Sequence, residues 1–287
     1  MIDRKKIEDL VRQALRDVVT SEGGDAAAVA AVAKKPLDSS GTVLLTPDRG
    51  VNLGTPADPG ALAAMLAAQP ARIAVGRAGT RFKTNTLLRF RADHAAARDA
   101  VQSEVDPKLL ERLGLFEVAT RATDKRHFLQ RPDAGRALSD EARATIAAKV
   151  PRAPQVLVIY GDGLSAAALN EHLETYHKAL ERELAAAGLR AAPAFFVRYS
   201  RVKVMDEIAR LVDAEAALFV CGERPGLGFA DSLSAYYIYK PGTGATDANR
   251  EVISNINPRG VDPARAAKLT ADALGRILRE RKSGVVL

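Results

Sequence analysis

The chain has 287 residues, of which 47% are hydrophobic and 27% charged, a composition typical of a folded protein with a sizeable core. Its formal net charge is +7, but Lys and Arg are spread along the sequence and mixed with Asp and Glu, which argues against a nucleic-acid partner. No apolar run approaches the roughly 18 residues of a membrane span, and the first residues lack a signal peptide pattern, so we expect a cytoplasmic protein without membrane contact.

Residues 1–45 are predicted to form an amphipathic helix followed by a flexible linker. Apolar residues recur at three- and four-residue intervals between positions 2 and 18, and a segment rich in Ala, Gly and Ser follows. Two interpretations are open for this helix. It docks on a partner, or it caps its own domain.

Residues 46–113 are predicted to form a smaller helical domain. The segments ADPGALAAMLAAQ and FRADHAAARDAVQSEV have helical patterns, and Pro107 breaks the second helix or begins a new one. The intervening VGRAGTRFKT carries glycines and basic residues, so it either contacts an anion or forms a solvated loop.

After Gly114 the hydrophobic period changes to that of strands. The short apolar runs LFEVAT, QVLVIYG, AFFVRYS and AALFVCG alternate with longer helical patterns. This alternation predicts an α/β fold over residues 114–287, with a Rossmann-like, doubly wound and mainly parallel sheet. Ligands bind such sheets at the carboxyl ends of the strands, where the glycine loops GDGLSAA and GERPGLG begin.

The few cysteines and histidines limit the chemistry of the chain. Cys221 is the single cysteine, which excludes a disulfide framework, and its place in an apolar run predicts a buried, inert thiol. None of the four histidines has the spacing of a zinc or iron site, so we expect no metal held by protein side chains alone.

The GDGLSA loop matches a dinucleotide fingerprint only in part. Gly161 and Gly163 have the required spacing after a strand, but the next strand ends in VRYSR, without the acidic residue that binds a ribose. Asp162 and Glu223 also place carboxylates where a pyrophosphate would lie. Ordinary glycine turns are one alternative. Another is that Glu223 accepts hydrogen bonds from the neutral amides of a large cofactor.

A set of motifs extends over nearly all of the chain after about Thr46. They are VGRAGTRFKTNTLLRFRADHAAARDAV, FLQRPDAGRALS, YGDGLSAAAL, RVKVMDEIA, CGERPGLGFADSLSAYYIY and ISNINPRG. In this combination and order the sequence resembles the small subunit of ethanolamine ammonia-lyase, a family that depends on adenosylcobalamin.

The resemblance implies that two chains with different roles form the enzyme. A large subunit would supply the catalytic barrel and the substrate pocket, and this chain would close over the corrin without catalytic residues of its own. Together they would convert ethanolamine to acetaldehyde and ammonia by a radical mechanism, whereas the isolated chain would be inactive. The family's corrin contacts correspond here to Val202, Glu223 and Val252.

The resemblance also carries one departure and two further implications. Val252 stands where relatives commonly carry Cys, which keeps an apolar or backbone contact and removes a role for a thiol. The chain has no DxHxxG motif, which in other cobalamin proteins supplies a histidine to cobalt. The nearest match is Asp93 followed directly by His94, and its spacing is wrong. This is consistent with the cofactor keeping its own base on cobalt. The N-terminal helix resembles signals that bring enzymes into bacterial microcompartments, with shell proteins as partners.

A nicotinamide-dependent oxidoreductase and a non-catalytic scaffold are the alternative functions.

Overall fold

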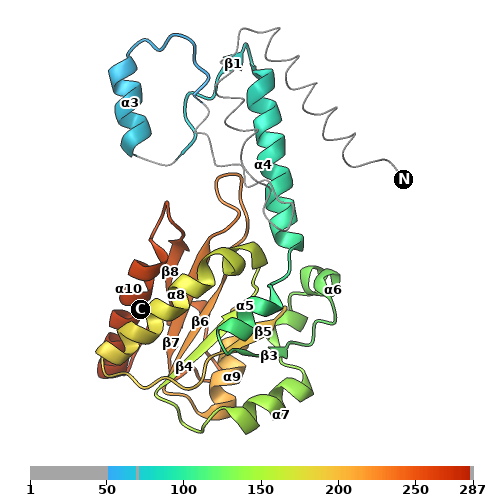
Figure 1. The fold of residues 1–287 in the computed structure, drawn as a ribbon, viewed down its shortest axis with the longest axis vertical. Coiled ribbons are helices and arrows are strands. Elements are labelled where there is room, and N and C mark those ends of the chain that lie inside the picture. The colour runs from blue at the N-terminus through green and yellow to red at the C-terminus, as the bar shows by residue number, and fades with distance from the viewer. Residues whose placement is uncertain (1–50, 69–70, 285–287) are drawn as a thin grey trace. The chain divides into compact units, whose positions relative to one another are not determined.

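The computed structural model describes residues 51–68 and 71–284 (Figure 1). Its contacts divide the chain into two units, 1–44 and 45–287, and every described residue belongs to the second. The helix and linker predicted for residues 1–45 lie outside the described residues. A boundary near residue 113 stays a prediction.

The two helices predicted between residues 46 and 113 are confirmed, with different bounds. They are α3 (Pro59–Ala68) and α4 (Thr84–Gln102), so α4 begins earlier than its sequence pattern indicates. The segment between them contains a short antiparallel hairpin of β1 (Arg77–Ala78) and β2 (Arg81–Phe82). The Arg77 guanidinium lies over the Phe82 ring, 4.5 Å from its centroid.

A new helix begins at Pro107, in the connection from α4 to the main sheet, as predicted. Helix α5 (Pro107–Arg112) has Pro107 in its first turn, and the Asp106 side chain accepts a hydrogen bond from the Lys108 N–H. This combination is favourable because proline needs no hydrogen-bond acceptor at that position and the cap satisfies one free N–H.

A six-stranded sheet forms the centre of the fold (Figure 1). In spatial order its strands are β3 (Phe116–Ala119), β5 (Phe195–Arg198), β4 (Val156–Gly161), β6 (Ala216–Gly222), β7 (Leu233–Tyr239) and β8 (Glu251–Ile256). The first four are parallel to one another, and they are the four strands predicted from the sequence. Strands β7 and β8 are antiparallel additions that the sequence analysis did not predict.

Helices cover both faces of the sheet. Alternate residues of β4 show this, because Val158 and Tyr160 belong to one apolar core and Leu157 and Ile159 to the other. The first core is closed by α5, α8 (Ala166–Ala186) and α10 (Pro263–Glu280), and the second by α7 (Asp140–Lys149) and α9 (Val204–Val212). The remaining short helix, α6 (Lys125–Gln130), precedes α7.

The predicted mixed α/β fold with a mainly parallel sheet is therefore confirmed. The central order β5-β4-β6 matches the 2-1-3 order of doubly wound sheets, whereas β3 at the edge and the antiparallel β7 and β8 depart from it. The Rossmann-like designation stays a prediction. Within the described ranges, no helix is both long enough and apolar enough to cross a bilayer.

Candidate functional site

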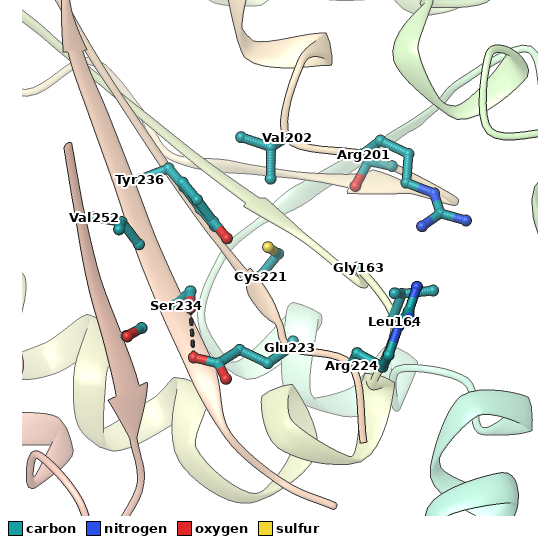
Figure 2. A pocket seen from close by; sticks show the side chains of 13 residues that line it. Gly163, Leu164, Arg201, Val202, Cys221, Glu223, Arg224, Ser234, Tyr236 and Val252 are labelled. Atoms are coloured by element: carbon teal, nitrogen blue, oxygen red, sulfur yellow. Dashed lines mark hydrogen bonds between the residues drawn. The ribbon is translucent and has the colours of Figure 1, made fainter. Parts of the chain in front are cut away.

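A cavity of about 500 Å³ lies where β4, β5 and β6 end, and it extends along β7 and β8 (Figure 2). This is the edge at which the topology predicts a ligand site. The cavity is lined by Gly163, Leu164, Ser200, Arg201, Val202, Cys221, Gly222, Glu223, Arg224, Ser234, Tyr236, Val252 and Ser254.

All three residues predicted to contact a cofactor line this one cavity. Val202 follows β5, Glu223 follows β6, and Val252 lies on the edge strand β8 with 48% of its surface exposed. The three residues come from distant parts of the sequence and meet only in the folded chain. Their contact with a cofactor stays a prediction.

The register of the antiparallel strands brings further side chains to the same face. Cys221 pairs with Ser234, and Tyr236 pairs with Val252. Because Ser234 and Tyr236 are two positions apart on β7, they point to the same side of the sheet. Strands β6, β7 and β8 therefore contribute one continuous wall to the cavity.

The Glu223 carboxylate is held in place by both antiparallel strands. Its Oε1 atom accepts a hydrogen bond from the Ser234 hydroxyl at 2.5 Å (Figure 2). The same oxygen accepts a second hydrogen bond from the Asn255 N–H at 2.8 Å. Within the described residues, Oε2 accepts no hydrogen bond. The carboxylate is thus fixed through one oxygen and retains the other as an acceptor.

The loop that begins with GERPGLG is a hairpin connection between β6 and β7. It is closed by backbone hydrogen bonds from Glu223 N to Ser232 O and from Gly226 N to Phe229 O, each 2.8 Å long. The Ser165 hydroxyl, at the start of α8, donates to Ala230 O at 2.6 Å. These contacts hold the loop at the end of β6.

Asp162 does not line the cavity and instead stabilises the neighbouring loop. Its carboxylate accepts hydrogen bonds from the backbone N–H groups of Tyr199 and Ser200, each at 2.8 Å. Lys125 Nζ is 4.0 Å from the same carboxylate. Burial raises the pKa of Asp162 to about 6. The side chain therefore ties the end of β4 to the segment that carries Arg201 and Val202.

The glycines of the GDGLSA loop permit close packing of two strand ends. Gly163 has φ +57°, and a Cβ at this position would lie 2.3 Å from Gly222 O. The loop therefore packs directly against the end of β6. This tight contact accounts for the glycine without a bound phosphate.

Arg201, Ser234 and Tyr236 were not among the site residues predicted from the sequence. Once LSAYYIY is recognised as a strand, its two-residue period places Ser234 and Tyr236 on one face. Cys221 is buried as predicted, and burial raises the pKa of its thiol, so it lines the cavity as a neutral group.

The described residues contain no cluster of three or more His, Cys, Asp and Glu side chains that could hold a metal ion. His94 is exposed on α4. Its neighbour Asp93 is buried and pairs with Arg72 at 2.6 Å and with Arg89 at 3.2 Å.

Comparison with known proteins identifies the family. A model of the ethanolamine ammonia-lyase light chain (EutC) family matches residues 59–287. A protein of Clostridium acetobutylicum is 42% identical over 226 residues, which cover 79% of this chain and 93% of the relative. Proteins of Clostridium perfringens and Clostridioides difficile are 41% and 42% identical over 232 residues, covering 81% of this chain and 79% of each relative.

All three relatives are named ethanolamine ammonia-lyase small subunit. The chain is thus a subunit of an enzyme, a lyase. It belongs to the ethanolamine ammonia-lyase light chain family, which confirms the resemblance found in its motifs.

Proposed function

We propose that this chain and a large subunit together convert ethanolamine to acetaldehyde and ammonia, and that its cavity binds part of adenosylcobalamin between the two chains. One observation carries the proposal. The positions that the family resemblance assigns to the corrin, Val202, Glu223 and Val252, line a single cavity although β-strands and helices separate them in the sequence.

The residues of the cavity fit such a ligand. A corrin combines an apolar ring with amide side arms, and the cavity combines apolar contacts from Val202, Val252 and the Tyr236 ring with the free Oε2 atom of Glu223. An amide N–H donated to a carboxylate makes a strong, charge-assisted hydrogen bond. The cavity has a volume typical of small-molecule sites and is smaller than the whole cofactor, so a second chain would cover the remainder.

The proposed role of this chain is positioning and shielding. When bound, the cofactor supplies the radical chemistry. Glu223 would orient an amide arm, and Val202 and Val252 would exclude water from the ring's edge. The proposal assigns no general acid or base to this chain, because substrate contacts belong to the large subunit.

Reconstitution tests the proposal. The chain is purified with and without its large subunit, and acetaldehyde formation from ethanolamine is measured with adenosylcobalamin. We expect activity from the pair and none from either chain alone. Activity of this chain by itself would contradict the proposal, and a tight nicotinamide complex would favour the oxidoreductase alternative. A pair that assembles but binds no cobalamin would favour a scaffold.

The proposal extends to a cellular location. Residues 1–58 precede the part of the chain that the family model matches, and their first segment has the amphipathic pattern of a docking helix. We propose that this segment brings the enzyme to the shell proteins of a bacterial microcompartment within the cytoplasm.

A further inference from the structure

The Arg201 side chain lines the cavity, and no carboxylate in the described residues forms an ion pair with it. One of its terminal nitrogens donates to Phe128 O at 3.3 Å, and the group lies over the Phe128 ring, 4.3 Å from the centroid. Its Nε atom is buried and has no hydrogen-bond partner, and Arg201 forms no ion pair within the described part of the chain. Such a donor is costly to leave unpaired.

The surroundings of Arg201 increase this cost. Arg136 and Arg224 are close enough for their repulsion, added to the larger effect of burial, to lower the pKa of the Arg201 guanidinium. Asp162 is the nearby carboxylate, but both of its oxygens already accept backbone hydrogen bonds from Tyr199 and Ser200. An anion in the cavity that bound the terminal nitrogens of Arg201 would relieve this repulsion.

The cavity therefore has two polar regions of different character. Figure 2 shows Arg201 and Arg224 on one side of the cavity and Val252, Tyr236 and Ser234 on the other. The free oxygen of Glu223 suits an amide donor, whereas the arginine side suits an anion. Guanidinium groups match the oxygens of a phosphate in a two-pronged geometry.

We propose that Arg201, assisted by Arg224, forms a subsite for a phosphodiester, and that in the assembled enzyme it binds the phosphodiester in the nucleotide loop of adenosylcobalamin. This inference rests on the proposed function. The cofactor carries neutral amide arms and a single phosphodiester, so its chemistry complements both polar regions of the cavity.

A ligand that lacks the phosphodiester tests the inference. Adenosylcobinamide has the corrin and its amides but no nucleotide loop. Dissociation constants of adenosylcobalamin and adenosylcobinamide are measured by equilibrium dialysis on the assembled two-subunit enzyme, without ethanolamine. The variants are Arg201→Gln and Arg224→Gln. The matched control is Arg265→Gln, an exposed arginine on α10 that does not line the cavity.

We expect Arg201→Gln to weaken adenosylcobalamin binding by about 10- to 100-fold, the effect of losing a hydrogen bond between charged groups. Its effect on adenosylcobinamide should be less than about threefold, because that ligand never engages the subsite. Arg224→Gln should show the same selectivity with a smaller loss, since Arg224 is exposed. Arg265→Gln should bind both ligands as the unaltered enzyme does.

If Arg201→Gln weakened the binding of both ligands equally, the inference would be overturned and Arg201 would be assigned a packing role. Loss of subunit assembly with an unchanged preference between the ligands would instead assign it to a carboxylate of the large subunit. If Arg201→Gln does not fold, Arg224→Gln tests the inference in its place: a loss of affinity for adenosylcobalamin alone would support the subsite, and equal losses for both ligands would overturn it. An unaltered enzyme that binds neither ligand would contradict the proposed function itself.

Discussion

At the scale of single residues, Glu223 is the side chain whose proposed role can be separated most cleanly from its structural role. Gln at this position can keep an oxygen for Ser234 and the Asn255 N–H, while it places an amide donor where the free carboxylate oxygen was. We expect Glu223→Gln to weaken adenosylcobalamin binding by about 1 to 3 kcal/mol. The melting temperature should be unchanged.

Glu223→Ala provides the contrast, because it also removes the acceptor for Ser234 and Asn255. This variant should lose both cofactor affinity and thermal stability. Glu171→Gln, at an exposed position on α8, is the control for the change of charge. Cofactor affinity that is unaffected in Glu223→Gln would remove Glu223 from the proposed site.

Asp162 gives a second prediction at this scale, on the pH dependence of stability. Burial raises its pKa from 3.8 to about 6, so the folded chain binds the proton at a higher pH than the unfolded chain does. The stabilising contribution of the protonated form is complete below about pH 4 and is lost as the pH rises to about 6. The free energy of unfolding should fall over this interval by on the order of 1 to 3 kcal/mol.

Urea unfolding of the unaltered chain and of Asp162→Asn between pH 4 and 7 measures this contribution. The difference in unfolding free energy between the two proteins should change through the interval and become constant above it. Parallel pH profiles would show that Asp162 does not titrate there. Asparagine should also cost stability at every pH, since Tyr199 N and Ser200 N bind different carboxylate oxygens and one of them would face the amide NH2 group.

At the scale of the elements, the contact between the β4–α8 loop and the end of β6 positions the whole cavity. Gly163 and Gly114 both have φ near +60°, but only Gly163 has a close neighbour, Gly222 O. Gly114→Ala should therefore cost about 1 to 2 kcal/mol, for the backbone conformation alone. Gly163→Ala should cost at least about 1 kcal/mol more, because the chain must also shift at the loop.

Chemical denaturation of the two glycine variants measures that difference. A displaced loop should also reduce cofactor affinity in Gly163→Ala, whereas Gly114→Ala should bind normally. Equal losses of stability in the two variants would mean that the loop accommodates a methyl group, and the contact with β6 would then not explain the glycine.

The elements also show which features the sequence could predict. Strands β4, β5 and β6 were predictable because their apolar runs are almost wholly buried and are separated by long helical patterns. The edge strand β3 is only partly buried, but it also has a short apolar run. Strand β8 was not, because Glu251–Ile256 is a largely exposed edge strand and its residues carry little hydrophobic pattern. Without β8, the pairing of Tyr236 with Val252 could not be inferred.

The same limit applies to the candidate site. Resemblance selected Val202, Glu223 and Val252, and the fold brings them to one cavity. Physical reasoning from the sequence favoured Glu223 as an acceptor for cofactor amides, which stays a prediction. The unpaired Nε of Arg201 could not be foreseen, because it depends on packing against Phe128 and Gly135. Such a contact between distant segments has no signal in local sequence.

At the scale of the whole molecule, the family match and the cavity both lie in the C-terminal part of the chain. The match begins at Pro59, where α3 begins, and the sheet, both of its helical layers and the cavity lie beyond that point. The amphipathic pattern of residues 2–18 lies outside both the match and the described residues. Catalysis and localisation should therefore be separable by truncation.

Deletion of residues 1–20 should leave assembly with the large subunit and acetaldehyde formation unchanged, because every residue assigned to the cavity is retained. In cells that form microcompartments, the same deletion should abolish co-purification with shells. A scrambled segment of the same composition separates the effect of helical amphipathicity from that of length and charge. If the truncated chain is still encapsulated, the signal must lie elsewhere, and if it loses activity, the first residues must contribute to assembly.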